Sequence, residues 1–381
     1  KVKEKNLDQS VSDILWKVAE DSANYSFNKS HSISYSFLAA WTCYLKFNFP
    51  QEFFLSLLRM TKYEPSPQEE ISKISQELSF FGIELLPPDL ALSDMDFSKE
   101  GKNIRFGLNS IKGISEKSLS YLKDFRSSNQ PNKYETFMSA KDSGLNIGVL
   151  SALIQAGALS SFKTNRPRLV LEAQVFNLLT DREKRNFTSI GDEYSFDILS
   201  SIDVAVKNQK VGDDGKPIIK PSRFETLKKK YQSYKKIYEQ NKKYEDFANW
   251  YFEKSLLGFS YSNELRNCFG NNKNLKNSLD VYSASKGDKI KCIAVVEDSF
   301  SRKSKNGNDY LKLTLSDEFG RYDAILVDGR FKNFTKFKNK SKMPEKTSIV
   351  IFLGSKGEDI IFLEELSIVD EKIYMKLSDL R

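Results

Sequence analysis

The sequence predicts a multidomain α+β protein that is mostly helical before residue 286 and ends in a small β-barrel. Before that point, apolar residues recur at intervals of three and four in several segments, which is the spacing of one face of an α-helix. After it, five short apolar runs are separated by turn residues, which is typical of strands joined by short connections. At 381 residues, the chain is long enough for two to four domains.

Composition and charge place the chain among globular proteins. It is 39% hydrophobic and 13% aromatic, while 29% charged residues and a mean hydropathy of -0.50 argue against a membrane protein. No apolar run reaches the length that a bilayer requires, so no membrane partner is expected. The net charge of +8 and the pI of about 9.0 are compatible with a polyanionic partner.

The numbers and positions of cysteine and histidine residues limit which disulfides, metal sites and catalytic triads the chain could form. Cys43, Cys268 and Cys292 are far apart, which favours neither a disulfide framework nor a zinc site and fits a reducing cytoplasm. His31 is the single histidine, which excludes multi-histidine metal sites and argues against a Ser-His-Asp triad. Because no signal or transit peptide follows Lys1, we expect the chain to be a portion of a longer product or one half of a split one.

Four helices are predicted in the first hundred residues. Their expected positions are residues 8–22, residues 32–47, a segment starting at Pro50, and residues 67–82 with the capping-box pattern at Ser66 to Glu69. The first two carry apolar stripes that we expect to be buried, made of Val11, Ile14, Leu15 and Val18 on the first and of Ile33, Phe37, Ala40, Trp41, Tyr44 and Leu45 on the second.

A compact polar group, Asn28 to His31, precedes the second helix. Lys29 brings an ammonium, His31 a ring nitrogen that can donate, and the helix starting near Ser32 would direct its positive end at the same place. This chemistry suits a triphosphate. The alternative is that Asn28 and Ser30 only cap the helix while Lys29 is solvated.

Several short sequence motifs in this region resemble the fingers domain of the bacterial replicative DNA polymerase, the alpha subunit of DNA polymerase III in family C. They are Phe27 to His31, Tyr35, Trp41, Leu45-Lys46 and Pro50 to Phe53, and the order of the following segments agrees over most of the chain. The resemblance implies nucleotide binding by Asn28, Lys29 and His31. It also implies nucleotidyl transfer by two Mg²⁺ ions held on palm aspartates, which are not in this sequence, so we expect no catalytic residue, no cofactor and no metal site in this chain alone. A metal site at Asp94 and Asp96 is the weaker alternative to ordinary turn chemistry.

The pattern from Leu108 to Leu122 resembles a helix-hairpin-helix. Gly113 permits a tight turn, and the amides that open the second helix could hold a DNA phosphate with Lys112 beside them. Ser115 stands where such hairpins usually have a second glycine, and a purely structural turn is the alternative. A second copy around residues 145–159 lacks a lysine in its turn, so we expect it to brace the first.

The next segment combines a basic helix with a candidate clamp-binding peptide. Lysines dominate between Arg223 and Lys243, where Glu225 and Glu239 are the only acids, and charge runs of this kind are usually solvated faces. The segment Gly191 to Phe196 occupies the place where the resembled polymerases bind their sliding clamp, with Phe196 as the remaining anchor. A plain surface loop is the alternative.

The strands expected near the carboxyl terminus have the order of an OB-fold barrel, with a helix between the third and fourth. They are Ile290–Val296, Tyr310–Ser316, Arg321–Val327, Thr347–Leu353 and Asp359–Leu363. The residues chosen for DNA binding are Arg302, Lys303, Lys305 and Tyr310, with Lys332, Lys336 and Lys338 as a second basic patch. Alternatively, Tyr310 belongs to the barrel core and the lysines serve solubility.

Together the chain resembles the carboxyl-terminal part of a family C polymerase. The expected domains are a fingers segment (1–100), a tandem helix-hairpin-helix (101–180), a basic helical linker (181–285) and an OB-fold (286–381). The expected partners are primer-template and single-stranded DNA, a palm-bearing part or chain, and a sliding clamp. The expected location is the cytoplasm, at the nucleoid or in a host cell if the gene is viral. The alternatives are a non-catalytic DNA-binding protein and an RNA-binding OB-fold protein.

Overall fold

The computed structural model describes residues 8–25, 29–128, 131–269, 274–327, 343–346 and 348–369, together with Lys5 and Gly329. The chain forms two compact units, Lys1–Ser56 and Leu57–Arg381. Each unit is described by itself. In the described residues, no helix combines the length and the apolar character that crossing a bilayer requires.

The first unit contains two long helices, α1 (Gln9–Tyr25) and α2 (Lys29–Asn48), and most of α3 (Pro50–Met60). The apolar stripes expected to be buried are exposed: Ile14 is 62% exposed and Trp41 is 63% exposed. The prediction that these side chains pack into a core of this chain is therefore wrong. The physical reason is that an apolar helix face is buried only when another surface covers it.

The second unit begins with α4 (Pro67–Phe80) and a three-stranded sheet. Pro67 opens α4 as predicted, but the Ser66 side chain makes no capping bond, so the expected capping box does not form. The sheet contains β1 (Leu85–Leu86), β2 (Ser98–Glu100) and β3 (Asn103–Arg105) in the order β1-β3-β2. Arg105 fastens this sheet, because its guanidinium makes two bonds to the Glu100 carboxylate and one to the Pro87 carbonyl.

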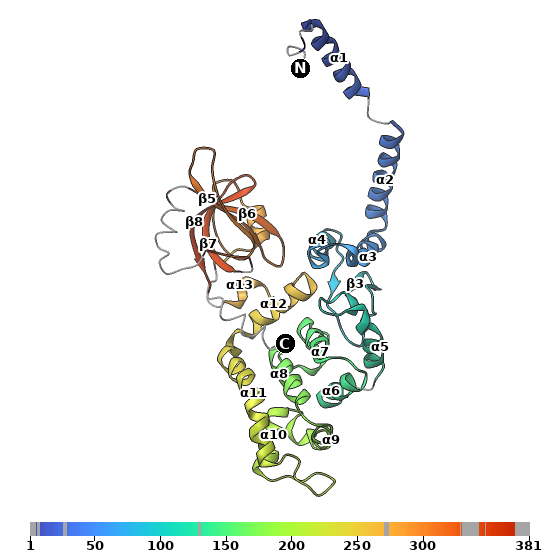
Figure 1. Cartoon of the computed structure of the whole chain (residues 1–381), viewed down its shortest axis with the longest axis vertical. Helices are drawn as coiled ribbons and strands as arrows, with labels where there is room; N and C mark the ends of the chain where they lie inside the picture. The colour runs from blue at the N-terminus through green and yellow to red at the C-terminus, as the bar shows by residue number, and fades with distance from the viewer. Residues whose placement is uncertain are drawn as a thin grey trace. The chain divides into compact units, whose positions relative to one another are not determined.

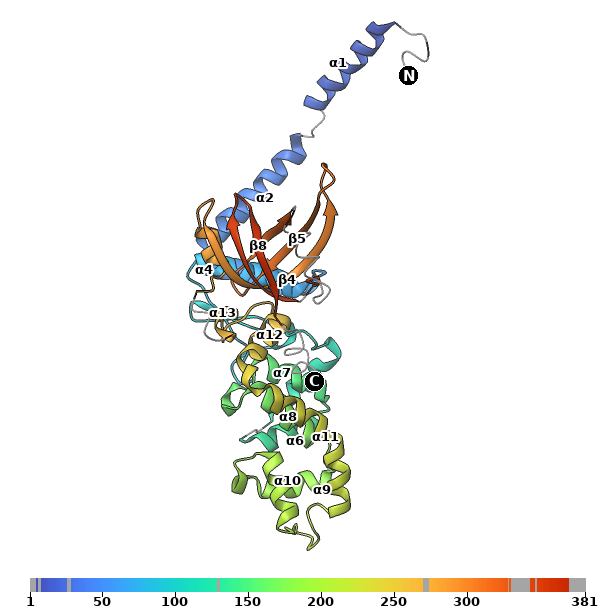
Figure 2. The same ribbon diagram turned by 90° about the vertical axis from the view of Figure 1, so that its left-hand side faces the viewer.

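A helical body follows the small sheet (Figures 1 and 2). Its helices are α5 (Leu119–Ser127), α6 (Lys133–Asp142), α7 (Ile147–Ala156), α8 (Arg166–Asn177), α9 (Asp181–Ser189), α10 (Ile198–Lys207), α11 (Pro221–Asn241), α12 (Glu245–Leu257), α13 (Leu265–Cys268) and α14 (Ser278–Ser283). Helix α7 packs against α8 and α12. Capping residues fix where several helices begin. Thr180 and Glu183 form a capping box at the start of α9, and Asn132 caps α6.

The last strands close into the predicted OB-fold barrel in the order β4-β5-β6-β8-β7. The strands are β4 (Lys289–Lys303), β5 (Asp309–Ser316), β6 (Arg321–Val327), β7 (Ile349–Lys356) and β8 (Ile360–Ile368). All pairs are antiparallel except β6 with β8, and the first half of β4 pairs with β7 while its second half pairs with β5. A register shift between Val296 and Asp298 marks this change of partner, because a bulge bends the strand. Most of the residues expected to form the helix after the third strand lie outside the described part of the chain.

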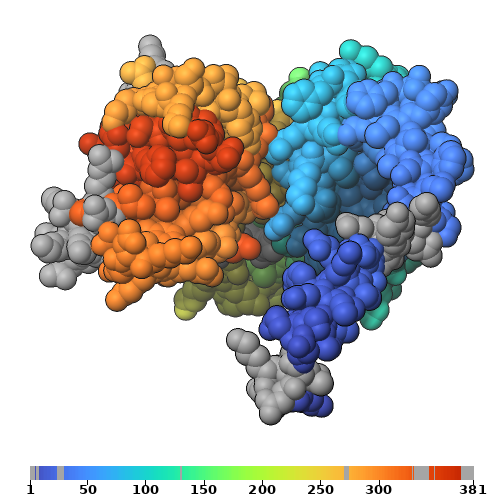
Figure 3. Space-filling model, turned by 90° about the horizontal axis from the view of Figure 1, so that it is seen from above, coloured from blue at the N-terminus to red at the C-terminus, as the bar shows by residue number. Residues whose placement is uncertain are grey.

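The barrel has a continuous apolar core. Figure 3 shows the outer surface of the barrel in orange and red. Leu311, Leu313 and Leu315 alternate inward along β5, opposite Phe352 of β7 and the Cys292 thiol of β4. Burial raises the pKa of Cys292 to about 12, so this thiol stays protonated as a core residue. Cys43, Cys268 and Cys292 are all free.

Candidate nucleic-acid interface

The first hairpin turn is built around a backbone conformation that only glycine adopts easily. Gly113 has φ +97, and Lys112, Gly113 and Ser115 are all exposed. The segment before the turn is a single 3-10 turn, Leu108–Ser110, where a helix was expected. After it, Ser115 precedes the 3-10 turn Glu116–Ser118, which leads directly into α5.

The hairpin turn is held in place by contacts to neighbouring helices. The Lys112 amide donates to the Leu256 carbonyl of α12 at 3.0 Å, and Gln68 of α4 donates to the Ser110 carbonyl at 3.3 Å. A cavity of about 230 Å³ lies beside the turn between these elements. Because the backbone is fixed from inside, the exposed Lys112 side chain and the first amides after Ser115 remain available on the outside.

The turn of the second hairpin copy is filled by protein atoms. Gly157 ends α7 with φ +88, and a Cβ there would overlap the Tyr261 hydroxyl oxygen. Arg166 at the start of α8 makes an ion pair with the fully buried Glu253 at 2.6 Å and donates to the Tyr261 hydroxyl at 2.9 Å. Side chains of the protein therefore pack closely around this turn, which suits a bracing role.

The outer face of the barrel gathers aromatic and basic side chains. Along β5 the leucines point inward, so Tyr310 and Lys312 lie on the outer face, and the alternative that Tyr310 belongs to the core is wrong. Strand register places Arg302 opposite Tyr310 and Phe300 opposite Lys312. The Arg302 guanidinium lies 4.9 Å from the centre of the Phe300 ring.

The face continues onto the two strands beside β5. Val327 of β6 is the cross-strand partner of Tyr310 and is 38% exposed, and Phe362 of β8 is 43% exposed. The Asp323 carboxylate lies among them, 2.5 Å from the Lys312 ammonium, and so neutralises part of the positive charge. The arrangement offers ring faces and cations together, which are the groups that hold single-stranded nucleic acid.

Sequence reasoning selected part of this face and missed Phe300, Lys312 and Phe362. Period-two alternation from Tyr310 was enough to place Lys312 beside it. Phe300 was missed because β4 continues beyond its predicted end at Val296, and Phe362 because no sequence signal tells which face of a short strand looks outward.

The other predicted basic residues are spread out. Lys303 is exposed at the end of β4, where alternation turns it away from Arg302, and Lys305 lies in the connection between β4 and β5. Lys332, Lys336 and Lys338 lie outside the described residues.

The predicted nucleotide-binding group is described only in part. Asn28 lies outside the described residues, and Lys29 is the first residue of α2, with its side chain outside the description. His31 is exposed, and its ring centre lies 4.3 Å from that of Tyr35. His31 is therefore accessible, as a nucleotide-binding role requires.

Phe196, the predicted clamp anchor, is partly buried in the helical body. Its ring packs edge-on against Tyr134 at 5.4 Å between centres and covers Gly191, where a Cβ would lie 2.5 Å from the ring. Its backbone has φ +54. Clamp binding stays a prediction, and it requires this ring to leave its contacts.

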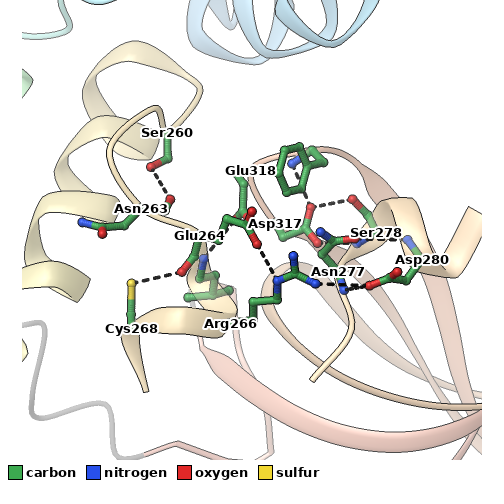
Figure 4. A network of polar contacts seen from close by, with 12 residues as sticks. Ser260, Asn263, Glu264, Arg266, Cys268, Asn277, Ser278, Asp280, Asp317 and Glu318 are labelled. Carbon is green, nitrogen blue, oxygen red and sulfur yellow. Dashed lines mark hydrogen bonds and ion pairs between the residues drawn. The ribbon is translucent and has the colours of Figure 1, made fainter. Parts of the chain in front are cut away.

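A buried polar network joins the barrel to the helical body (Figure 4). Glu318, in the turn after β5, accepts from the Trp250 indole at 3.0 Å and from the Leu265 amide at 3.1 Å. Burial raises the pKa of Glu318 to about 7, and the neighbouring Asp317 charge adds to this effect. Asp317 itself accepts from the amide and hydroxyl of Ser278, at 2.5 and 2.6 Å.

Lys254 completes the junction from α12. Its ammonium donates to the Asp317 carbonyl at 3.0 Å, and burial lowers its pKa. Arg266 pairs with Glu264 and lies 3.4 Å from Asp280. In the part of the chain that the structure describes, no three His, Cys, Asp or Glu side chains are grouped to hold a metal ion. The contacts of Glu318 and of the Asp317 carbonyl connect the barrel to the helical body.

Comparison with known proteins gives one family model and a consistent set of curated relatives. The model, described as a helix-hairpin-helix motif, matches residues 82–169. The DNA polymerase III subunit alpha of Aquifex aeolicus is 37% identical over 41% of this chain and 13% of that protein. The subunits of Bacillus subtilis and Borreliella burgdorferi are each 25% identical, over 82% and 97% of this chain and 25% and 29% of their own lengths. The chain thus spans less than a third of these relatives.

Two solved structures each match a barrel-sized part of the chain. The mitochondrial single-stranded DNA binding protein Rim1 of S. cerevisiae gives a TM-score of 0.19 at 11% identity, over 22% of this chain and 97% of that one. The second OB-fold domain of replication protein A from Methanococcus maripaludis gives 0.18 at 17% identity, over 23% and 88%. The strand order of the barrel, and not these matches, identifies its fold.

Proposed function

We propose that this chain is the DNA-holding part of a family C replicative polymerase, because it is similar over 82% and 97% of its length to the DNA polymerase III alpha subunits of Bacillus subtilis and Borreliella burgdorferi. The observation that carries the proposal is the presence, in one chain, of a glycine-based hairpin turn and an outward-facing aromatic and basic barrel surface. The assembled enzyme would transfer nucleotides from deoxynucleoside triphosphates to a primer. Its working place would be the cytoplasm, at the nucleoid or in the host of a virus.

The hairpin would hold the duplex through its backbone. Amides at the start of a helix have no intrahelical acceptor, and the exposed Lys112 adds a positive charge beside those that follow Ser115. Contacts of this type go to phosphate oxygens and carry no sequence information. This is the property that a polymerase needs behind its active site.

The barrel face would hold the unpaired template strand. Tyr310 and Phe300 would offer ring faces for base stacking, while Arg302 and Lys305 would contact the backbone of the strand. Strands two and three and the loop between strands one and two are the usual binding surface of an OB-fold. In this chain these correspond to β5, β6 and the connection that contains Lys305.

The palm would come from another part of the polymerase, and the first unit would dock against it. The exposed apolar residues of α1 and α2 include Trp16 at 75%, Trp41 at 63% and Phe47 at 71% exposure. Apolar patches of this extent mark a protein interface. On this arrangement Asn28, Lys29 and His31 would contact the incoming nucleotide, and the palm would hold the Mg²⁺ ions, because the described residues of this chain offer no acidic cluster that fits them.

The proposal also includes binding of a sliding clamp through Phe196. The Phe196 ring would have to leave Tyr134 and enter a pocket of the clamp, which costs the burial that it has now. A Phe196→Ala variant should lose clamp-dependent processivity only if the ring does so. Unchanged processivity on primed DNA loaded with clamp would remove Phe196 from the proposal.

The test is reconstitution of primer extension. The chain alone should extend no primer, and mixing it with the palm-bearing part from the same source should restore extension on a primed template. Lys29→Ala should raise the KM for deoxynucleoside triphosphates, while Lys29→Arg serves as the charge-preserving control. Equal activity with and without this chain would overturn the polymerase role.

Binding measurements separate the remaining alternatives. Salt-dependent binding to DNA without any stimulation of a palm-bearing part would favour a non-catalytic DNA-binding protein. Transfer RNA that displaces DNA would favour an RNA-binding OB-fold protein. If the chain binds neither DNA nor RNA in a salt-dependent manner, the polymerase role, the DNA-binding alternative and the RNA-binding alternative are all excluded.

A further inference from the structure

Helix α11 carries a basic surface that neither the hairpin nor the barrel accounts for. Between Arg223 and Lys243 there are eight basic and two acidic residues, a net charge of +6, against +8 for the whole chain. Arg223 is paired with Glu183 at 3.2 Å, but most of the lysines project from the helix into solvent. A large positive charge is thus concentrated on α11 and the 3-10 turn Lys242–Tyr244 that follows it.

The inner face of α11 fixes how the helix is rotated. Leu227, Tyr231, Tyr238 and Asn241 are buried, at the spacing of a single helix face, and α11 packs against α8. The Tyr238 hydroxyl donates to the Glu245 carboxylate at 2.5 Å, and the Arg168 guanidinium lies 5.7 Å from the centre of its ring. Both tyrosines are therefore held toward the helical body.

The opposite face is a continuous row of hydrogen-bond donors, which we name the α11 stripe. Because residues two and five positions apart lie roughly 140 to 200° around a helix, Lys229 and Lys236 point away from Tyr231. The stripe consists of exposed residues of α11 and of the 3-10 turn Lys242–Tyr244 that follows it, with the exposed Glu225 at its edge four residues before Lys229: Ser222, Thr226, Lys229, Ser233, Lys236, Gln240 and Lys243. In the described part of the chain, no carboxylate lies within ion-pair distance of Lys229, Lys236 or Lys243. Figures 1 and 2 both show α11 at the edge of the helical body.

The chemistry of the stripe fits a regular row of phosphates. From the helical rise per residue, Lys229 and Lys236 are about 10 Å apart along the axis of α11, and Lys243 follows in the 3-10 turn Lys242–Tyr244. The stripe has no aromatic ring on which a base could stack, so it would contact only the backbone. It also has no apolar side chain to enter a membrane or to anchor a protein interface, since the apolar side of α11 faces the body.

We propose that the α11 stripe binds the sugar-phosphate backbone of duplex DNA, as a third contact besides the hairpin and the barrel. The proposal rests on the DNA-holding function proposed above and adds a surface to it. Each neutralised phosphate releases a counterion, so the stripe should contribute to affinity and to its salt dependence without any sequence preference.

The test is charge reversal on the full chain. Lys229→Glu, Lys236→Glu and Lys243→Glu together should lower duplex affinity more than tenfold and reduce the slope of log affinity against log salt by roughly three. Single-strand binding at the barrel should change by less than threefold. Arginine at the same three positions is the matched control and should bind like the wild type, and circular dichroism should show equal helix content in all three proteins.

The outcomes distinguish the stripe from the wider proposal. An unchanged salt slope in the glutamate variant, while the wild type binds duplex DNA, would overturn the stripe and leave the DNA-holding function intact. Loss of binding in the arginine variant as well would also overturn it, because the positive charge is retained there. A wild type that binds no DNA would instead overturn the DNA-holding function.

Discussion

The carboxyl-terminal barrel and the two amino-terminal helices use apolar residues in opposite ways. In the barrel, strands β4 to β8 enclose a core in which Leu313 and Val350 are fully buried. Helices α1 and α2 also carry large apolar side chains, yet Trp16 and Trp41 are mostly exposed. The difference is one of closure, because a barrel supplies both sides of its own core and a single helix supplies one.

The two regions differ in whether contacts within the chain cover their apolar surfaces. The barrel reaches its fold through contacts among its own strands. The apolar faces of α1 and α2 point to a surface that another part of a polymerase would supply. The predictions below test this difference, beginning with the largest effect.

The largest effect is expected from removing a barrel core ring. Phe352→Ala should destabilise the barrel by about 3 to 5 kcal/mol, because Phe352 is 1% exposed and its removal leaves a cavity. Trp41→Ala should change the stability of the isolated chain by less than about 0.5 kcal/mol, since the ring is exposed. Urea denaturation followed by circular dichroism measures both.

The same pair of variants tests the assembly. Trp41→Ala should weaken binding to the palm-bearing part, and Phe352→Ala should weaken it only by unfolding. If Trp41→Ala instead destabilises the isolated chain by several kcal/mol, the ring is covered within this chain and the contrast between the two regions is lost.

The sequence was sufficient for elements whose pattern and surroundings agree. All five barrel strands were predicted, because alternation of apolar residues matches a barrel that buries one face of each strand. The amphipathic pattern of α2 also predicted its helix, but not the exposure of Trp41, since the spacing of apolar residues says nothing about which surface covers them.

Some residues of the candidate interface were predicted from the sequence, and others were missed. Arg302 and Tyr310 were found from local composition, and the register of β4 with β5 brings them opposite each other. Phe300 depends on a bulge that lengthens β4 past its predicted end, and Glu318 depends on contacts with α12 and α13 that are distant in sequence. Such long-range pairings leave no periodic signal.

The second effect concerns how the barrel is fastened to the helices. The pKa of Glu318 is raised from its ordinary value of 4.5 to about 7, so the folded state favours the protonated carboxyl. The stabilisation is complete below about pH 4.5 and is lost as the pH rises to about 7, because the unfolded chain releases this proton first. Its upper bound is about 3 kcal/mol.

Glu318→Gln should remove this pH dependence. The variant should therefore be more stable than the wild type above pH 7 and about equal to it below pH 4.5. Trp250 offers a direct readout, because its indole donates to Glu318 and the other tryptophans, Trp16 and Trp41, can be replaced by Phe. Identical pH profiles of stability and of Trp250 fluorescence in the wild type and in the Glu318→Gln variant would contradict the assignment.

The third effect is a loss of affinity for single-stranded DNA when an exposed aromatic ring is removed from the barrel but not from α2. Tyr310→Ala should weaken single-stranded DNA binding by about 1 to 3 kcal/mol if a base stacks on its ring. Trp41→Ala should leave that affinity unchanged, because Trp41 has no role in the barrel face. Tyr310→Phe is the control that keeps the ring, and a loss equal to that of the alanine variant would show that stacking is not the contribution of Tyr310.

The smallest effect is expected at the hairpin, where the backbone and not the side chain makes most of the contact. Lys112→Ala should reduce the duplex salt slope by about 0.9, the contribution of one phosphate, and lower affinity only a few-fold. Ser115→Gly should leave both unchanged, because Ser115 is exposed and its hydroxyl contacts only Ser118 among the described residues. A slope that does not change in Lys112→Ala would mean that the hairpin shapes the body without touching DNA, so the barrel face and the α11 stripe would be the remaining candidate contacts with the nucleic acid.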